Sequence, residues 1–182
     1  MKASVYIATT LDGFIARENG GLDWLPGSNG EVPVESENED FGFNEFMKSI
    51  DVLVMGRNTY ELAISAGMWP YGNKRVIVLS STLRNLADRT PNTVELKSEL
   101  PTDLYKNLEN SGAEHLYVDG GKTIQGFLNS DLIDEIIITK VPVLIGTGIP
   151  LFGPLNNDKK LKHVETRAFK NGFVQSKYEV IK

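Results

Sequence analysis

One stretch of this chain reads Val52-Leu53-Val54-Met55-Gly56-Arg57-Asn58-Thr59-Tyr60-Glu61, an apolar strand that meets a glycine turn and opens a helix. A second stretch repeats the pattern as Leu116-Tyr117-Val118-Asp119-Gly120-Gly121-Lys122-Thr123-Ile124. A helix N-terminus carries unpaired N–H groups and a partial positive charge, and glycine lets a phosphate approach the backbone there. Glycine is common at strand–helix corners in α/β domains. Two such turns, each with a cation and a threonine, together with Ser80-Ser81 at the end of another strand, favour a nucleotide.

Strands and helices alternate on both sides of these turns. The apolar patterns predict strands at residues 3–9, 52–55, 75–80, 93–96, 115–118 and 134–140. They predict helices at residues 36–49, 57–66, 101–110 and 122–128, the first of them capped by Ser36 or Asn38. The tail differs, because residues 162–169 and 173–181 flank Asn171-Gly172, a hairpin signal. This order predicts one α/β domain over residues 1–182, with a mostly parallel central sheet and a C-terminal antiparallel hairpin.

Composition limits the function classes. The 182 residues suffice for one domain with a sizeable core, and a net charge of −5 argues against a nucleic-acid coat protein. The chain has no cysteine, which excludes disulfides, thiolate metal sites and a cysteine nucleophile. The N-terminal segment reaches Asp12 too soon for a signal peptide, and no apolar run is long enough to span a membrane. We expect a cytoplasmic protein without a nucleic-acid, membrane or metal partner.

Four segments occur in a familiar order. They read Ile7-Ala8-Thr9-Thr10-Leu11-Asp12-Gly13-Phe14-Ile15-Ala16, Val54-Met55-Gly56-Arg57-Asn58-Thr59-Tyr60-Glu61, Val78-Leu79-Ser80-Ser81 and Val118-Asp119-Gly120-Gly121. Together they resemble the dihydrofolate reductase superfamily. Residues 132–138 and 142–152 are similar to its branch with the reductase domain of the riboflavin-biosynthesis deaminase-reductase. The resemblance covers nearly the whole chain and implies a three-layer, dihydrofolate reductase-like fold.

The resemblance also implies NADPH as the cofactor. In this family the two glycine turns bind the pyrophosphate, which maps onto Gly56, Arg57, Asn58, Thr59, Gly120, Gly121, Lys122, Thr123 and Ile124. The adenosine 2′-phosphate maps onto Arg57, Ser80 and Ser81, and a guanidinium suits it because it makes forked contacts with phosphate. The nicotinamide maps onto Ala8 and Ile15. The peptide between Gly120 and Gly121 is expected to be cis, as in relatives.

The same resemblance places the substrate between the first-strand turn, the helix at residues 36–49 and the nicotinamide. The substrate-binding residues expected there are Tyr6, Asp12, Trp24 and Phe43. Trp24 lies in a glycine-rich loop of the kind that closes over the nicotinamide in relatives, where an aromatic ring shields hydride transfer from water. Ordinary packing of that loop is the alternative.

Reduction of a C=N or C=O group needs a proton as well as a hydride. Counting back from Met55, Asp40 falls where dihydrofolate reductases place a carboxylate on the preceding helix. Phe41 and Phe43 follow it, and burial among them would raise its pKa toward a value useful for proton donation. Asp40 is therefore the expected catalytic residue. The alternative is a first-turn acid that stabilises the helix dipole.

The chain departs from the riboflavin branch at three places. Tyr6 stands where those enzymes carry lysine, Thr10 where they carry serine, and Gly56-Arg57-Asn58-Thr59 replaces a motif with Asp-Pro. We therefore predict an NADPH-dependent reductase of a small polar heterocyclic or ribosylamino-pyrimidine-like substrate, similar to 5-amino-6-(5-phosphoribosylamino)uracil reductase. The alternatives are a true dihydrofolate reductase and a non-catalytic NADPH- or pterin-binding module.

A homodimer is the expected assembly. Relatives in the riboflavin branch pair through their C-terminal strands. Residues 142–145 and 149–152 form an apolar segment without helical period, and an exposed patch of that kind tends to be an interface. Burial of the segment in the core of one chain is the alternative.

Overall fold

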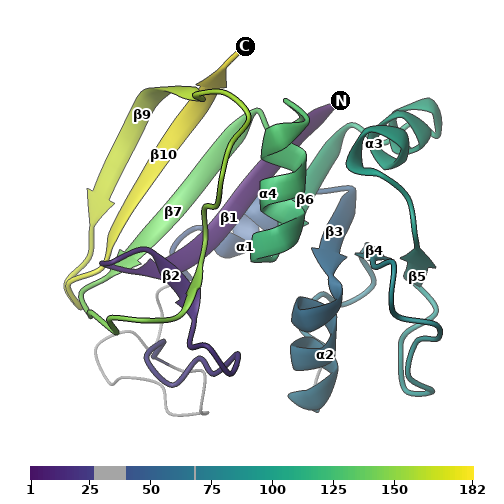
Figure 1. Cartoon of the computed structure of the whole chain (residues 1–182), viewed down its shortest axis with the longest axis horizontal. Coiled ribbons are helices and arrows are strands. Elements are labelled where there is room, and N and C mark those ends of the chain that lie inside the picture. The colour runs from purple at the N-terminus through teal and green to yellow at the C-terminus, as the bar shows by residue number, and fades with distance from the viewer. Residues whose placement is uncertain (27–39, 68) are drawn as a thin grey trace.

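An eight-stranded sheet forms the centre of the computed structural model, which describes residues 1–26, 40–67 and 69–182 (Figure 1). Its strands are β1 (Lys2–Thr10), β3 (Val52–Gly56), β4 (Arg75–Leu79), β5 (Val94–Lys97), β6 (His115–Asp119), β7 (Glu135–Val141), β9 (Lys160–Ala168) and β10 (Val174–Ile181). They lie in the order β5-β4-β3-β6-β1-β7-β10-β9. Neighbours from β5 to β7 are parallel, and β10 is antiparallel to both β7 and β9. The predicted parallel sheet with a C-terminal hairpin is confirmed.

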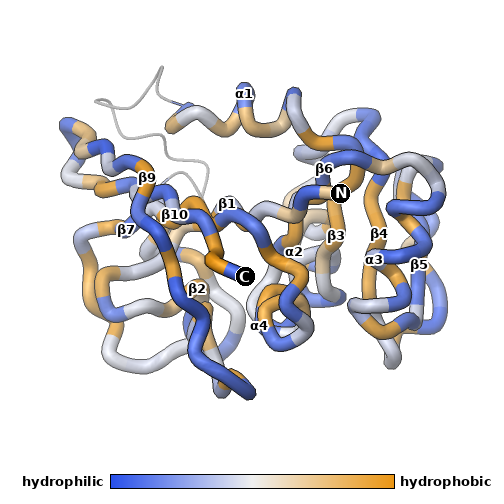
Figure 2. The backbone as a smooth tube through the Cα atoms, turned by 90° about the horizontal axis from the view of Figure 1, so that it is seen from above, coloured by the Kyte–Doolittle hydropathy of each residue, from blue (hydrophilic) through white to orange (hydrophobic). Residues whose placement is uncertain are grey.

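Helices cover both faces of the sheet (Figure 2). They are α1 (Phe43–Lys48), α2 (Arg57–Ser65), α3 (Pro101–Asn110) and α4 (Gly121–Asn129). Phe46 of α1 and Tyr60 of α2 belong to one apolar cluster, whereas Leu104 of α3 and Phe127 of α4 belong to the cluster on the opposite face. The central strands are buried on both faces because helices cover both, as parallel sheets require.

The helix predicted at residues 36–49 is shorter in the structure. Its two predicted caps lie within residues 27–39, outside the described part of the chain. The helix begins only at Phe43, because Phe41 and Gly42 have φ angles of 54° and 86°. A right-handed helix cannot continue through such angles.

Two short strands have no counterpart in the sequence prediction. β2 (Phe14–Ala16) pairs with β8 (Ile149–Pro150) in a separate two-stranded sheet. This pairing places the turn after β1 against the long connection between β7 and β9. Within residues 1–26, 40–67 and 69–182, no helix is long and apolar enough to cross a bilayer.

Packing of α3 against the sheet gives a direct test of the core. Leu104 is 2% exposed, whereas Leu100, just before the same helix, is 67% exposed. Leu104→Ala should lower the free energy of unfolding by about 2–5 kcal/mol, because it removes buried methyl groups and leaves a cavity. Leu100→Ala should change it by less than about 0.5 kcal/mol. Urea denaturation of both variants measures the difference, and equal losses would contradict this packing.

Candidate functional site

The two glycine turns lie against each other, because β3 and β6 are neighbouring strands. A Cβ on Gly56 would lie 2.8 Å from Thr123 Oγ1, and a Cβ on Gly120 would lie 2.6 Å from Thr59 Oγ1. Each glycine is therefore covered by the threonine in the first turn of the other helix. Gly120 also has a φ of 88°, which glycine adopts without strain. These crossed contacts fix the N-termini of α2 and α4 side by side.

Both helix starts offer backbone N–H groups to a ligand. Neither α2 nor α4 has a side-chain cap at its N-terminus. Asn58 and Lys122 are exposed at these starts. The amide of Ile124 donates to the carbonyl of Gly120 at 2.9 Å, and the Ile124 side chain is fully buried, so this residue supports the helix. The earlier amides of each turn, together with the helix dipole, form an anion-binding edge.

The second turn also contacts β2. The expected cis peptide is wrong, because every described peptide bond is trans, including the one between Gly120 and Gly121. Gly120 makes the corner with its own dihedral angles, φ 88° and ψ 135°. A Cβ on Gly121 would lie 2.9 Å from Ile15 Cδ1. Ile15, which we expect beside the nicotinamide, thus lies over this turn.

Arg57 reaches from the start of α2 to the loop after β4. Its Nη1 donates to Thr82 Oγ1 at 3.4 Å, and the amide of Thr82 donates to Ser80 Oγ at 3.3 Å. Glu61, one turn along α2, lies 3.7 Å from Arg57 Nε. The structure thus gathers Arg57 and the Ser80-Ser81 strand end at one corner. The sequence analysis missed Thr82, although it directly follows the two serines.

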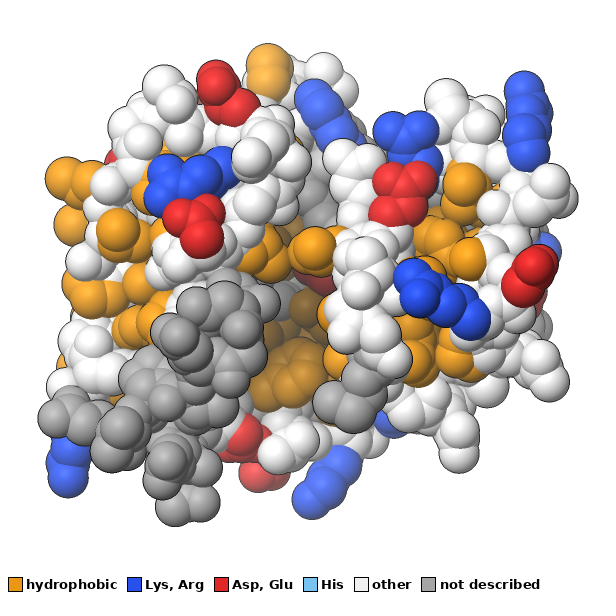
Figure 3. Space-filling model, turned by 90° about the horizontal axis from the view of Figure 1, so that it is seen from below, with side chains coloured by type: hydrophobic (Ala, Val, Ile, Leu, Met, Phe, Trp, Pro, Cys, Tyr) orange, Lys and Arg blue, Asp and Glu red, His pale blue; other side chains and the backbone are white. Residues whose placement is uncertain are grey.

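Both turns follow the carboxyl ends of parallel strands, and this face of the molecule has a hollow (Figure 3). Figure 3 shows this face with the hollow at its centre and hydrophobic side chains on the floor. A pocket of about 240 Å³ lies between β1 and α1, and we call it the small pocket. It is lined by Tyr6, Ala8, Leu25, Pro26, Asp40, Phe41, Phe43, Thr139 and Phe173.

Tyr6 forms one wall of the small pocket. Its hydroxyl donates to the carbonyl of Phe41 at 2.7 Å and accepts from Gln175 Nε2 at 3.0 Å. Its ring lies 5.4 Å from Phe43 and 4.9 Å from Phe46, centroid to centroid. Burial raises the pKa of the Tyr6 phenol, so it stays neutral at ordinary pH. The structure therefore brings Tyr6, Phe43 and Ala8 together as expected.

Asp40 lies at the rim of the small pocket and is exposed. Its carboxylate accepts hydrogen bonds from the amides of Asn44 at 2.9 Å and Gly42 at 3.0 Å. These hydrogen bonds lower the pKa of Asp40. The expected burial and raised pKa are therefore wrong. The carboxylate stabilises the start of α1, which is close to the alternative role given above.

Asp12 is engaged within the fold. Its carboxylate accepts from Thr10 Oγ1 at 2.5 Å and from the amides of Ile145 and Gly146 at 3.1 and 2.8 Å. These hydrogen bonds lower the pKa of Asp12. They tie the turn after β1 to the connection after β7. Asp12 thus holds these two segments together and does not line the small pocket.

Trp24 packs inside the loop that follows β2. It is 8% exposed and shares an apolar cluster with Val141 and Phe173. Its indole N–H has no hydrogen-bond partner among the described residues. Leu25 and Pro26, and not Trp24, line the small pocket. Trp24 therefore holds the loop against the sheet, the alternative that the sequence left open.

Comparison with known proteins identifies the family. The sequence profile of the RibD C-terminal domain matches residues 2–175. The chain belongs to the RibD C-terminal domain family. The uncharacterized protein YwjB of Bacillus subtilis (strain 168) is 34% identical over 170 residues, which cover 92% of each chain. A Shewanella sp. PV-4 crystal structure named for riboflavin biosynthesis matches with a TM-score of 0.91 and 40% identity over 100% of both chains.

A more distant structure shows the same fold. It is the Thermotoga maritima diaminohydroxyphosphoribosylaminopyrimidine deaminase/5-amino-6-(5-phosphoribosylamino)uracil reductase, with a TM-score of 0.70 and 16% identity. The match covers 99% of this chain and 56% of that one. The predicted dihydrofolate reductase-like fold and the riboflavin-reductase branch are thereby confirmed, and the family is reductase-like.

Asp119 is a titratable residue beside the second glycine turn that the sequence analysis did not select. It ends β6 directly before the second glycine turn, and its Oδ1 accepts the amide of Gly120 at 2.8 Å. Burial raises the pKa of Asp119 to about 6. Tyr71 and Tyr117 lie close enough to feel its charge. A carboxylate between a buried parallel strand and a glycine turn is the signal that would have pointed to it.

The raised pKa predicts a pH-dependent stability. Between about pH 3.8 and 6 the folded chain holds a proton on Asp119 that the unfolded chain has released, so the free energy of unfolding falls as pH rises. Asp119→Asn keeps an oxygen acceptor for Gly120 and removes this slope. The variant should be more stable than wild type above pH 6, by on the order of 2 kcal/mol, and nearly equal at pH 4.

Urea denaturation across this pH range measures the effect. Asp88→Asn, at an exposed position, is the control and should track wild type. A stability difference between Asp119→Asn and wild type that does not change with pH would contradict the prediction.

Proposed function

We propose that this chain is an NADPH-dependent reductase that transfers a hydride to a small polar heterocycle of the ribosylamino-pyrimidine class. The observation that carries the proposal is the pair of uncapped helix N-termini locked together by crossed glycine–threonine contacts. Membership of the RibD C-terminal domain family supports a reductase. When bound, NADPH would supply the hydride, and the protein would supply binding, orientation and a proton.

The residues present fit a phosphorylated dinucleotide. A Cβ at Gly56 or Gly120 would collide with a threonine hydroxyl, so glycine at both positions keeps the two uncapped helix starts side by side, and their free amides suit a pyrophosphate. Arg57, beside the hydroxyls of Ser80 and Thr82, suits a 2′-phosphate, because a guanidinium offers several donors to phosphate oxygens. Ser81 completes this corner in the proposal.

The small pocket suits the substrate ring. Its walls are largely aromatic and aliphatic, with polar groups at Tyr6, Thr139 and Asp40. Gln175 fixes two of these groups, since its Nε2 donates to both Tyr6 Oη and Thr139 Oγ1 at 3.0 Å. A mostly apolar pocket with a few fixed polar groups is the usual form of a site for a flat heterocycle. Phe43 is placed to stack on such a ring.

Asp119 is better matched than Asp40 to proton donation. A general acid works best when its pKa lies near the working pH, and the pKa of Asp119 is about 6. The pKa of Asp40 is lowered by two backbone hydrogen bonds, so its carboxyl holds a proton only in acid. The pKa thus favours Asp119, whereas Asp40 and not Asp119 lines the small pocket, so both acids are candidates for the proton and their variants are compared below.

The proposal is tested by mixing purified protein with NADPH and following its oxidation. The substrates are 5-amino-6-(5-phosphoribosylamino)uracil and, in a separate arm, dihydrofolate. Turnover of the first supports the proposal. Turnover of dihydrofolate alone would make the chain a dihydrofolate reductase, and tight NADPH binding without turnover of either would make it a binding module.

Cofactor preference depends on Arg57. Losing one charge-assisted contact costs about 1.5–3 kcal/mol, so Arg57→Ala should weaken NADPH binding by about tenfold or more. NADH binding should barely change, because NADH lacks the 2′-phosphate. Arg75→Ala is the matched control, since Arg75 pairs with Glu95 at the opposite end of β4. Fluorescence titration measures both cofactors, and equal losses for the two would refute the assignment.

Replacing Asp119 and replacing Asp40 should affect turnover differently. Asp119→Asn should leave NADPH affinity intact and lower turnover by about 100-fold, because asparagine cannot give up a proton. Asp40→Asn should keep most of the turnover, since the amide oxygen can still accept from Gly42 or Asn44. The reverse pattern in steady-state kinetics would return the catalytic role to Asp40.

We also propose that the chain forms a homodimer. Leu144 and Phe152 of the apolar segment are 68% and 44% exposed, whereas Leu151 is 1% exposed and belongs to the core. All nine residues of β9 are exposed at the edge of the sheet. An edge strand with one unpaired side, in a chain that also exposes apolar side chains, suits a contact with a second copy.

Light scattering tests the assembly. Wild type at micromolar concentration should have twice the mass of one chain, and Leu144→Glu should move the equilibrium toward the monomer. Leu62→Glu, on exposed α2 surface, is the control because Leu62 is 45% exposed outside this segment. A monomeric wild type would end the proposal.

A further inference from the structure

A second cavity lies under α1, away from the glycine turns. Its volume is about 370 Å³, and we call it the α1 cavity. Side chains from β1, β6, β7, β9 and β10 line it opposite α1, and its principal polar residues are Lys2, His115, Glu135, Arg167, Gln175 and Lys177. The volume lies in the range of small-molecule sites. Nothing in the proposed reductase function uses these charged groups.

Glu135 is the centre of the charged cluster. Its side chain is 8% exposed, and its Oε2 lies 2.9 Å from both Lys2 Nζ and Lys177 Nζ. Ser4 Oγ lies 3.3 Å from the other carboxylate oxygen. Burial raises the pKa of Glu135, but the two ammonium groups outweigh burial, so its pKa is below the usual value. Two cations therefore share one ionised carboxylate, so this cluster is locally positive, while Glu45 and Glu165 line other parts of the cavity.

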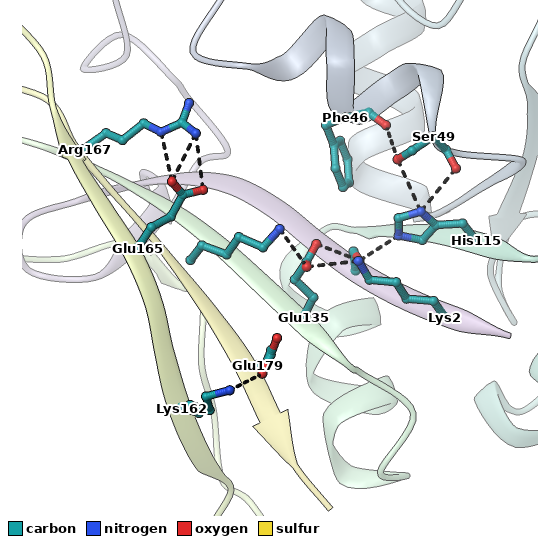
Figure 4. Close-up of polar contacts among 11 residues, drawn as sticks. Lys2, Phe46, Ser49, His115, Glu135, Lys162, Glu165, Arg167 and Glu179 are labelled. Carbon is teal, nitrogen blue, oxygen red and sulfur yellow. Dashed lines mark hydrogen bonds and ion pairs between the residues drawn. The ribbon is translucent and has the colours of Figure 1, made fainter.

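The cations keep donors for a further anion. An ammonium group has three N–H donors, and the side chains of Lys2 and Lys177 remain 44% and 30% exposed. Arg167 lies on β9 at the same cavity and pairs at 3.1 Å with Glu165, two residues away. Figure 4 shows this pair and the Glu135 cluster. Exposed pairs of this kind contribute little, so Arg167 is available to a ligand.

The polar groups here do not form a hydrolase triad. His115 Nε2 lies 2.8 Å from Ser4 Oγ, and its Nδ1 lies 3.1 Å from the carbonyl oxygen of Ser49. Glu135 contacts Ser4 and not His115. Ser4 is completely buried, so its hydroxyl cannot reach a substrate. Burial lowers the pKa of His115, which leaves the lysines and Arg167 as the cations of the cavity at neutral pH.

We propose that the α1 cavity binds a small organic phosphate or carboxylate, whose anionic group lies between Lys2, Lys177 and Arg167. The cavity is larger than a bare phosphate, so the ligand has an organic body beside Phe46 and Ile137. Glu45, exposed on α1, faces the same space and favours hydroxyl or amino groups at that end of the ligand.

The anion has two conceivable sources. Tyr6 and Phe41 line both the α1 cavity and the small pocket, so the two spaces share a wall. The anionic group is therefore either the far end of a long substrate whose ring lies in the small pocket or part of a separate molecule. Binding of the anion itself does not depend on the reductase proposal.

Calorimetric titration of the whole protein with inorganic phosphate and with glycerol phosphate tests the site. Wild type should bind glycerol phosphate more tightly than phosphate, and Lys177→Gln and Arg167→Gln should each weaken it by about tenfold or more. Lys162→Gln is the matched control, because Lys162 pairs with Glu179 on the same hairpin outside the cavity lining. Arg57→Ala should keep the binding event that Lys177→Gln and Arg167→Gln weaken, because a phosphate held at the Arg57 corner would be a separate event.

Arg167→Gln keeps the test decisive if Lys177→Gln does not fold, since Arg167 is exposed on an edge strand. Absence of binding in wild type, or equal losses in Lys162→Gln and Arg167→Gln, overturns the proposal. Loss of binding in Arg57→Ala alone overturns it as well, because the phosphate would then occupy the glycine turns. If the reducible substrate competes with glycerol phosphate, the anionic group is the far end of that substrate. If the two bind at the same time, the anionic group belongs to a separate molecule.

Discussion

The reciprocal contact between two helix starts organises this molecule. β3 and β6 are adjacent parallel strands, so the helices that follow them begin at the same edge of the sheet. Gly56 faces Thr123 and Gly120 faces Thr59, at distances that leave no room for a Cβ. Both helix starts lack side-chain caps, so the first amides of α2 and α4 lie uncapped at the same edge of the sheet. The hollow, the Arg57 corner and the contact with Ile15 all depend on this alignment.

The elements that could be predicted from the sequence are those with a clear apolar pattern. The elements that were missed depend on contacts between residues far apart in the chain. Buried parallel strands such as Val52–Gly56 form continuous apolar runs, and their order along the chain indicated the sheet. β2 and β8 are too short to show a period, and they exist because Phe14 and Ile149 lie on segments brought together by the fold. The start of α1 depends on left-handed angles at Phe41 and Gly42, which no periodicity encodes.

In the candidate site, too, the features with a local sequence pattern could be predicted, and those that depend on distant contacts could not. The glycine turns could be recognised locally, because the residue types that bind phosphate adjoin each other in sequence. The environments of Asp40 and Asp119 could not be recognised in this way. Asp40 accepts hydrogen bonds from amides two and four residues along, and Asp119 is desolvated by burial in the folded chain. The pKa values of Asp119 and Glu135 differ for the same reason: Asp119 lacks a cationic partner among the described residues, whereas two lysines contact Glu135.

The crossed contacts between Gly56 and Thr123 and between Gly120 and Thr59 also limit which substitutions the sequence can accept. A larger side chain at Gly56 needs a smaller one at Thr123, whereas a larger one at Gly120 would strain the backbone at its φ of 88° even with a smaller residue at Thr59. Residues in direct contact have non-additive effects, so each pair behaves as one unit of substitution. Positions more than sixty residues apart in sequence are thereby coupled. Related chains should keep Gly120, and they should replace Gly56 only together with Thr123.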